Sequence, residues 1–167
     1  MRQLSIEFIN KNKHLFKINQ IDRIVINEYR GGYGHRGGIE KERISIKRDS
    51  ITYSNIDYRN GDFESKEFEG KLMSSWRFNP SKHNPIIDET FNELWNHALR
   101  ECLIHTQPLT CNHDGNSFDI SIEFKDKSFY KTFGYTNLYE EGMMYIADLI
   151  KTLIPKGAKY PSVLDKH

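Results

Sequence analysis

The stretch ERISIKRDSITYSNIDYR at residues 42–59 constrains the fold most, because its apolar residues alternate with polar ones. Ile44 and Ile46 stand on either side of a serine, and the alternation resumes after the polar pair Arg48-Asp49. Successive side chains of a strand point to opposite faces, so a period of two places the apolar residues on one face. The stretch predicts two antiparallel strands joined by a turn at Arg48-Asp49, each with one buried face and one wet face.

Further stretches of the chain also predict strands. Residues 20–29 are rich in branched apolar residues, and alternation is present in residues 74–78, 116–124 and 128–135. Branched and aromatic side chains fit the pleated surface of a sheet, which favours this assignment. Because several such strands follow one another with short polar breaks between them, we expect them to pair as hairpins in one antiparallel sheet.

The period changes in residues 84–106, where apolar residues recur at steps of three and four. That spacing predicts a helix with one apolar face. Asn84-Pro85 is a suitable start for the helix, because proline is favoured in the first turn. Asp88 and Glu89 then lie near the positive end of the helix dipole, which they complement.

A second helix is predicted in residues 137–155, again from apolar residues that share one face. Asn137 is a suitable N-cap, and Glu140 three residues later completes a capping-box arrangement. Pro155 ends this helix because proline cannot continue the hydrogen-bond pattern. The remaining residues, 155–167, are expected to form a loosely held tail.

These elements predict an α+β fold, an antiparallel sheet with two helices packed on one face, in a single domain that spans residues 1–167. A chain of this length buries enough apolar surface to fold without disulfides or metal. The expected core residues are those on the apolar faces of these strands and helices, namely Ile24, Ile26, Ile44, Ile46, Phe91, Leu94, Trp95, Leu99, Ile120, Ile122, Ile146, Leu149, Ile150 and Leu153.

Charge is unevenly distributed along the chain, although the net charge is only +1. Residues 1–60 hold 12 Lys and Arg against 7 Asp and Glu, whereas the rest of the chain is slightly acidic. The N-terminal stretch has no apolar run that would serve as a signal peptide, and no segment has the length of a membrane span. We therefore expect a cytoplasmic protein without membrane contact, with its 2 cysteines as free thiols.

The densest group of titratable residues is a set of histidines and cysteines in and after the first helix. His97, His105, Cys111 and His113 are candidate zinc ligands by residue type. Their spacing differs from that of a zinc knuckle, and Cys102 between them falls on the apolar stripe of the helix. The favoured interpretation is therefore that the chain has no metal site and no cofactor.

The glycine-rich segment RGGYGHRGG at residues 30–38 is a candidate binding loop. Tyrosine and arginine are the side chains most often found as anchors of interfaces. Arg30, Tyr33, His35 and Arg36 are therefore the predicted contact residues. A phosphate-binding role is disfavoured because the loop lacks a lysine followed by Ser or Thr and precedes a strand. A tight hairpin with Tyr33 against the core is the structural alternative.

The stretch NHDGNSFDISIEF at residues 112–124 combines a histidine with an Asp-Gly pair. We interpret Asp114-Gly115 as a turn that leads into a strand, because aspartate accepts local backbone hydrogen bonds and glycine adopts positive φ. His113 has no partner in the sequence that marks it as a catalytic base. With this interpretation, the stretch is a structural motif, and it is not counted among the catalytic candidates.

The order of segments from about residue 21 to residue 154 resembles an uncharacterised group of small bacterial α+β domains. The matching features are the Asp114-Gly115 turn, an aromatic-x-apolar-x-Ile strand, and a Gly-x-x-Asn-x-Tyr start of the last helix, with Phe118, Ile120, Ile122, Gly134, Asn137 and Tyr139 at those positions. Phe118 replaces the usual Trp, and Glu140 replaces a Pro. The resemblance implies an α+β fold and a bacterial source. It implies no particular reaction.

These observations favour a protein-binding module without catalysis, although the sequence leaves its partner and oligomeric state open. Two alternatives remain. One is a metal-assisted hydrolase or nuclease that uses the His/Cys residues. The other is a module for single-stranded nucleic acid that uses the basic N-terminal third, which the alternation of aromatics with charged residues makes less favoured.

Overall fold

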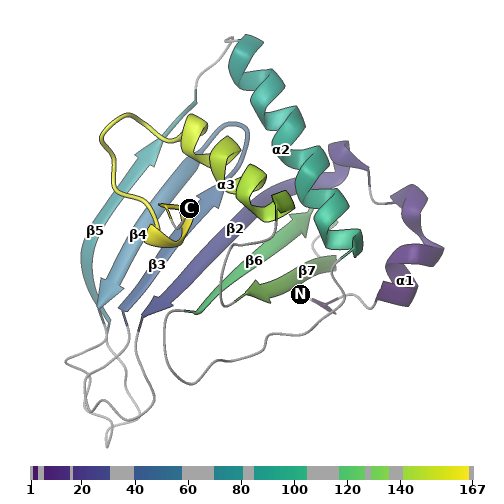
Figure 1. The fold of residues 1–167 in the computed structure, drawn as a ribbon, viewed down its shortest axis with the longest axis horizontal. Helices are drawn as coiled ribbons and strands as arrows, with labels where there is room; N and C mark the ends of the chain where they lie inside the picture. Colours follow the sequence, from purple (N-terminus) through teal and green to yellow (C-terminus); the bar gives the residue numbers. More distant parts are fainter. Residues whose placement is uncertain are drawn as a thin grey trace, which may run out of the picture.

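The computed structural model describes residues 2–3, 6–15, 17–30, 40–57, 70–80, 85–104, 117–126, 129–135 and 141–165. These residues form an α+β fold built on one sheet of seven strands, in the spatial order β1-β7-β6-β2-β3-β4-β5 (Figure 1). The strands are β1 (Arg2–Gln3), β2 (Ile21–Arg30), β3 (Glu40–Ile46), β4 (Ile51–Asp57), β5 (Lys71–Phe78), β6 (Ser117–Phe124) and β7 (Phe129–Tyr135).

Every neighbouring pair of strands is antiparallel except the short β1, which runs parallel to β7. The hairpin predicted in residues 42–59 is confirmed as β3 and β4. Its turn is closed by backbone hydrogen bonds between Lys47 and Ser50, on either side of Arg48 and Asp49. β2 lies between β3 and β6 in the middle of the sheet, so the first long strand of the sequence is also its most protected strand.

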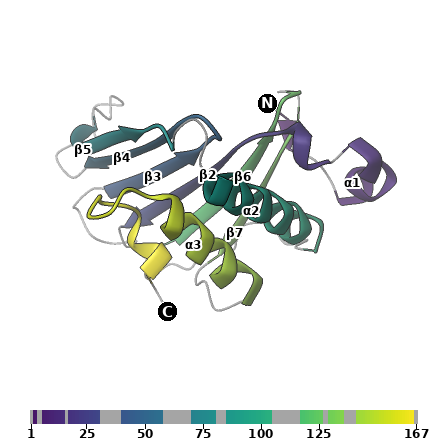
Figure 2. The ribbon, with the colours of Figure 1, turned by 90° about the horizontal axis from the view of Figure 1, so that it is seen from above.

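The helices are α1 (Ile6–Lys11), α2 (Pro85–Ile104) and α3 (Glu141–Leu153), with three short 3-10 turns, η1 (Lys13–Leu15), η2 (Ile18–Gln20) and η3 (Ser162–Asp165). Figure 2 shows α2 and α3 side by side on the same face of the sheet, as the sequence predicts. α2 begins at Pro85, which confirms the predicted start. The sequence analysis did not predict α1, whose six residues are too few to show a helical period.

The core lies between these two helices and the sheet. Ile24 of β2 opposes Ile46 of β3 and Ile122 of β6, and the next row of the sheet repeats the pattern with isoleucines. The predicted core is confirmed, with Leu99 as a partly buried member at its margin. Truncation of such a buried side chain typically costs about 2–5 kcal/mol, so these rows account for much of the stability.

The turn between β3 and β4 is tied to α2 through Arg48. Its guanidinium donates a hydrogen bond to Asn92 Oδ1 over 2.5 Å. The same guanidinium lies 5.9 Å from the ring centroids of both Phe91 and Trp95, within reach of a cation–π interaction. One exposed turn residue therefore fixes the first strands of the sheet against the helix that covers them.

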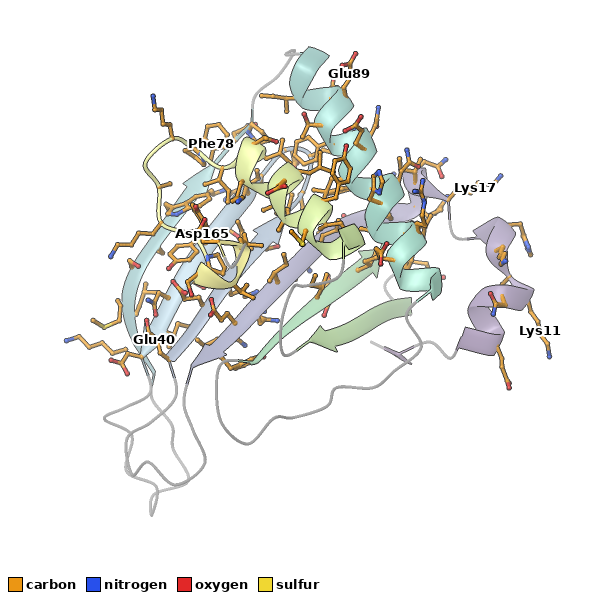
Figure 3. All side chains as sticks on the ribbon, viewed as in Figure 1. Lys11, Lys17, Glu40, Phe78, Glu89 and Asp165 are labelled. Atoms are coloured by element: carbon orange, nitrogen blue, oxygen red, sulfur yellow. The ribbon has the colours of Figure 1, made fainter. Side chains whose placement is uncertain are left out.

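The C-terminal residues differ from the sequence-based expectation. The sequence predicts a loosely held tail over residues 155–167, but Val163 and Leu164 in its described part are each 1% exposed and belong to the core. The indole N–H of Trp76 on β5 also donates a hydrogen bond to the carbonyl oxygen of Lys159. The segment crosses back over the helix-covered face of the sheet and ends near Asp165 (Figure 3). Val163 and Leu164 show no helical or strand period in the sequence, so their packing was not predictable from it.

Candidate functional site

The predicted binding loop falls largely outside the residues that the structure describes. Tyr33, His35 and Arg36 are not among the described residues, and Arg30 is placed only as the last residue of β2. The loop therefore stays a prediction from the sequence. The Asp114-Gly115 turn and the Asn137 cap also lie outside the described residues.

Of the predicted metal candidates, only His97 is described, since His105, Cys111 and His113 lie outside the described residues. The His97 ring on α2 contacts the ring of Tyr145 on α3 edge to face, with 4.4 Å between the ring centroids. Within the described part of the chain, no group of three His, Cys, Asp or Glu residues is arranged to hold a metal ion. His97 thus belongs to the contact between the two helices.

Among the described residues, two buried glutamates form the group that most resembles an active site. They were not predicted from the sequence. Glu28 on β2 and Glu42 on β3 are direct cross-strand partners. They are 0% and 5% exposed. Both side chains point to the face of the sheet that carries α2 and α3, because both continue the alternation of the core isoleucines on their strands.

Each of the four carboxylate oxygens accepts a hydrogen bond. Glu28 accepts from the Ser162 hydroxyl over 3.0 and 3.2 Å and from the Val163 backbone N–H over 2.9 Å. Glu42 accepts from the Tyr53 hydroxyl over 2.5 Å and from the Ser162 backbone N–H over 3.3 Å. The two carboxylates therefore hold the C-terminal segment at the start of η3.

This arrangement indicates a structural clamp. A general acid or base needs a carboxyl group within hydrogen-bond reach of a substrate. Glu28 and Glu42 instead direct their oxygens at Tyr53 and at the C-terminal segment, whose residues Val163 and Leu164 are themselves buried. Buried polar atoms need hydrogen-bond partners, and these contacts supply them.

The opposite face of the sheet is the main candidate for a binding surface. Figure 2 shows α2, α3 and the C-terminal segment on one side of the strands β2 to β5, with no described helix on the other side of them. The residues that alternate with the core residues point to this other side, which we call the uncovered side because it carries no described helix. Val25, Asn27 and Ser45 near its centre are buried, so its exposed part lies on the outer strands. On the outer three strands these residues are Lys41, Arg43, Ser45, Thr52, Ser54, Ile56, Leu72, Ser75 and Arg77. We call the polar and charged members that are not buried the basic face, namely Lys41, Arg43, Thr52, Ser54, Ser75 and Arg77.

Charge is segregated between the two sides of these strands. On β3 the acids Glu40 and Glu42 point to the helix-covered side, and Lys41 and Arg43 point to the uncovered side. Asp57 on β4 pairs in register with Glu40 and shares its side. The basic face therefore carries three cations and, among the strand residues of β3, β4 and β5 on that side, no acid.

Among the described residues, the cations of the basic face have few partners. The Lys41 ammonium lies 5.2 Å from the centroid of the Tyr29 ring, a cation–π distance. Within the described part of the chain, no carboxylate forms an ion pair with Arg43 or Arg77. Arg77 is exposed and Arg43 is half-buried, so both guanidinium groups are placed to meet charges from outside.

The neighbouring part of the same face is electrically balanced. Arg23 on β2 forms an ion pair with Glu123 on β6. Lys47, which follows β3, lies 3.2 Å from the Asp22 carboxylate. The unbalanced positive charge is therefore confined to the outer strands of the uncovered side.

No protein-family model matches the chain, and comparison with curated proteins also finds no match. The geometry of the described residues is thus the basis for a functional proposal. No described helix is both long and apolar enough to cross a membrane.

Proposed function

We propose that this protein is a non-catalytic module that binds another protein, and that the basic face receives an acidic surface of that partner. The charge segregation on β3, where Glu40 and Glu42 point inward and Lys41 and Arg43 point outward, carries the proposal. Complementary potentials steer association and select partners, so an unbalanced positive patch favours an acidic one.

Catalysis has less support. The buried carboxylates Glu28 and Glu42 are engaged by Tyr53 and by the C-terminal segment. His97 packs against Tyr145 between the helices. These are the described titratable groups that most resemble catalytic machinery, and each has a structural role that explains its position.

A protein partner is favoured over single-stranded nucleic acid by the chemistry of the uncovered side. Sheets that bind single strands present exposed aromatic rings on which bases stack. Among the side chains described on this side, Tyr29 is the only aromatic one, and Lys41 lies over its ring. Hydroxyl and guanidinium groups can hydrogen-bond to carboxylates of a protein surface, and this contact needs no stacked rings.

Charge alone gives little affinity, because exposed ion pairs contribute about 0–1 kcal/mol each. Apolar contact must supply the rest of the binding free energy. Leu72 and Met73 on β5 are 57% and 52% exposed, and they adjoin the basic face. Charged and apolar groups thus lie together on the outer strands, as at the interfaces of proteins.

We also place this binding in the cytoplasm of a bacterial cell. The 2 cysteines give no disulfide framework, which suits a reducing compartment. The bacterial source rests on the resemblance of the segment order to small bacterial domains.

The test compares the wild-type protein with an Arg43→Glu/Arg77→Glu variant. A matched control, Lys17→Glu/Lys156→Glu, makes the same change in net charge at two exposed residues that are not on the basic face. The immobilised proteins are exposed to nuclease-treated bacterial lysate, and binding of poly-L-glutamate and of oligothymidylate is measured in parallel at low and high salt.

The proposal expects a protein that wild type and the control both retain and that the basic-face variant loses. Poly-L-glutamate binding should show the same dependence and weaken with salt. Equal retention by all three proteins would overturn the proposal. Strong salt-dependent binding of oligothymidylate without binding of poly-L-glutamate would favour the nucleic-acid alternative instead.

A further inference from the structure

The outer edge of β5 is the longest open edge of the sheet. β5 is the last strand in the sheet order and is paired on one side only, with β4, within the part of the chain that the structure describes (Figure 1). It has 8 residues and contains no proline. The other edge strand, β1, has only 2 residues. An exposed strand edge presents backbone N–H and C=O groups that pair readily with another chain.

The backbone groups that point outward follow from the register. Lys47 and Ser50 exchange both backbone hydrogen bonds, over 2.9 and 3.4 Å, so they form a hydrogen-bonded pair. Such pairs alternate along antiparallel strands. On β4 the next residue that is hydrogen-bonded to β3 is two positions after Ser50. The residue that follows it, Tyr53, therefore directs its backbone groups to β5, where Trp76 is its partner.

It follows that Ser74, Trp76 and Phe78 direct their backbone groups inward to β4. Ser75 and Arg77 direct theirs outward. Both of these residues are exposed, and both of their side chains belong to the basic face. The outward backbone groups and the positive charge therefore occur on the same residues.

Natural edge strands are protected by prolines, bulges and charges. On β5 the irregularity lies near its start, where the register shifts opposite Asn55 and Ile56. From Ser74 to Phe78 the register is uninterrupted. This regular part is where an added strand could pair.

We propose that the β5 edge accepts an extended acidic segment of the partner protein as an added strand, through the backbone groups of Ser75 and Arg77. The inference rests on the proposed function and names the form in which the partner binds. The regular part of β5 carries Arg77 on the basic face and no acid, so acidic residues of the incoming segment that point to the basic face complement it. Exposed Leu72 and Met73, which precede this regular part, offer apolar contact at one end of the segment.

A second copy of this chain fits the edge less well. Pairing β5 with itself would bring Lys71 and Arg77 of both copies into one small interface that contains no acid from either β5. Like charges across neighbouring strands are destabilising. Charge complementarity therefore favours a foreign acidic segment.

The experiment uses a fluorescent peptide in which glutamate and valine alternate, with fluorescence anisotropy as the readout. Ser75→Pro removes one outward N–H, and proline is tolerated on an edge strand where its nitrogen faces solvent. Ser75→Ala is the matched control, because it keeps the backbone donor and loses the hydroxyl. A peptide of equal charge interrupted by prolines tests the same requirement on the wild-type protein, whatever the folding of the variant.

We expect Ser75→Pro to raise the Kd of the alternating peptide about tenfold, which corresponds to about 1.4 kcal/mol, and Ser75→Ala to leave it within a factor of two. The interrupted peptide should bind the wild type as weakly as the alternating peptide binds the proline variant. Amide exchange at Ser75 and Arg77 should slow when the peptide binds.

The two proposals fail in different ways. If Arg43→Glu/Arg77→Glu weakens binding but Ser75→Pro and the interrupted peptide do not, strand addition is overturned and the proposed function stands. If neither change weakens binding, both proposals are overturned. A dimer of the wild-type protein that Ser75→Pro dissociates would overturn the acidic segment in favour of a second copy.

Discussion

Glu28 and Glu42 face each other directly across strands β2 and β3, and the same residue, Ser162, donates hydrogen bonds to both. The hydrogen bonds from Ser162 and its neighbour Val163 satisfy buried carboxyl oxygens of both residues. The pair explains why the C-terminal segment is packed against the sheet. It also directs Glu28 and Glu42 away from the basic face.

The hydroxyl of Tyr53 should matter for stability because it donates to a buried carboxylate. Tyr53→Phe removes the hydrogen bond to Glu42 Oε1 and is expected to lower the free energy of unfolding by about 1.5–3 kcal/mol. Tyr145→Phe is the matched control, since its hydroxyl donates to Glu93 at the exposed surface. The control should change stability little, because its hydroxyl is exposed to solvent. Urea unfolding measures both, and equal effects would refute the clamp.

Glu28 and Ser162 should be energetically coupled. Glu28→Ala leaves the buried N–H of Val163 without its acceptor, so we expect a loss of about 1–3 kcal/mol in the free energy of unfolding. In a double-mutant cycle with Ser162→Ala, the coupling should be about 0.5–3 kcal/mol. Glu89→Ala, an exposed change on α2, serves as the control. A coupling near zero would show that the C-terminal segment packs independently of Glu28.

Leu149 tests the assignment of the buried face of α3. Leu149→Ala should lower the free energy of unfolding by about 2–5 kcal/mol, because the side chain is buried in the core. The exposed Asp148→Ala on the same helix is the control, and it should move the urea midpoint little. An unchanged midpoint for Leu149→Ala would contradict the packing of α3 on the sheet.

Alkaline pH should destabilise the packing of the C-terminal segment, because the Tyr160 hydroxyl loses its proton. Its hydroxyl donates to Asp165 Oδ1 over 2.7 Å, and this hydrogen bond, with burial and the nearby negative charge, raises the pKa of Tyr160 above 10.0. A pKa that is higher in the folded state gives stability that is present below pH 10.0 and is lost as the pH rises through the folded-state value. Tyr160→Phe should reduce this alkaline loss in urea unfolding between about pH 9 and pH 11. An identical pH profile for the variant would contradict the assignment.

The periodic parts of the fold were predictable from the sequence. Alternation in residues 42–59 predicted β3 and β4, and the stripe beginning near Pro85 predicted α2, because burial of one face dictates the spacing of apolar residues. The packing of Val163 and Leu164 was not predictable, since it depends on a contact with Glu28 more than 130 residues away. Long-range polar contacts leave no period in the sequence.

The candidate surface was predictable in principle. The segment Glu40-Lys41-Glu42-Arg43 alternates acid and base at strand period, so the two charges must face opposite sides of the sheet. What the sequence did not show is which side the helices cover, and that decides whether acid or base is exposed. The sequence-based candidates in residues 30–38 and 105–113 rest on residue type alone, and they lie almost wholly outside the described residues.

If the basic face is the binding surface, it should contact an acidic polymer directly. The most direct test is an NMR titration of the isotopically labelled protein with poly-L-glutamate, in which the backbone amide shifts report the contact site. We expect the largest changes at residues Arg43, Ser54, Ser75 and Arg77 of β3, β4 and β5, with small changes on α2 and α3. The largest changes at the helices, or at Lys17 and Lys156, would contradict it.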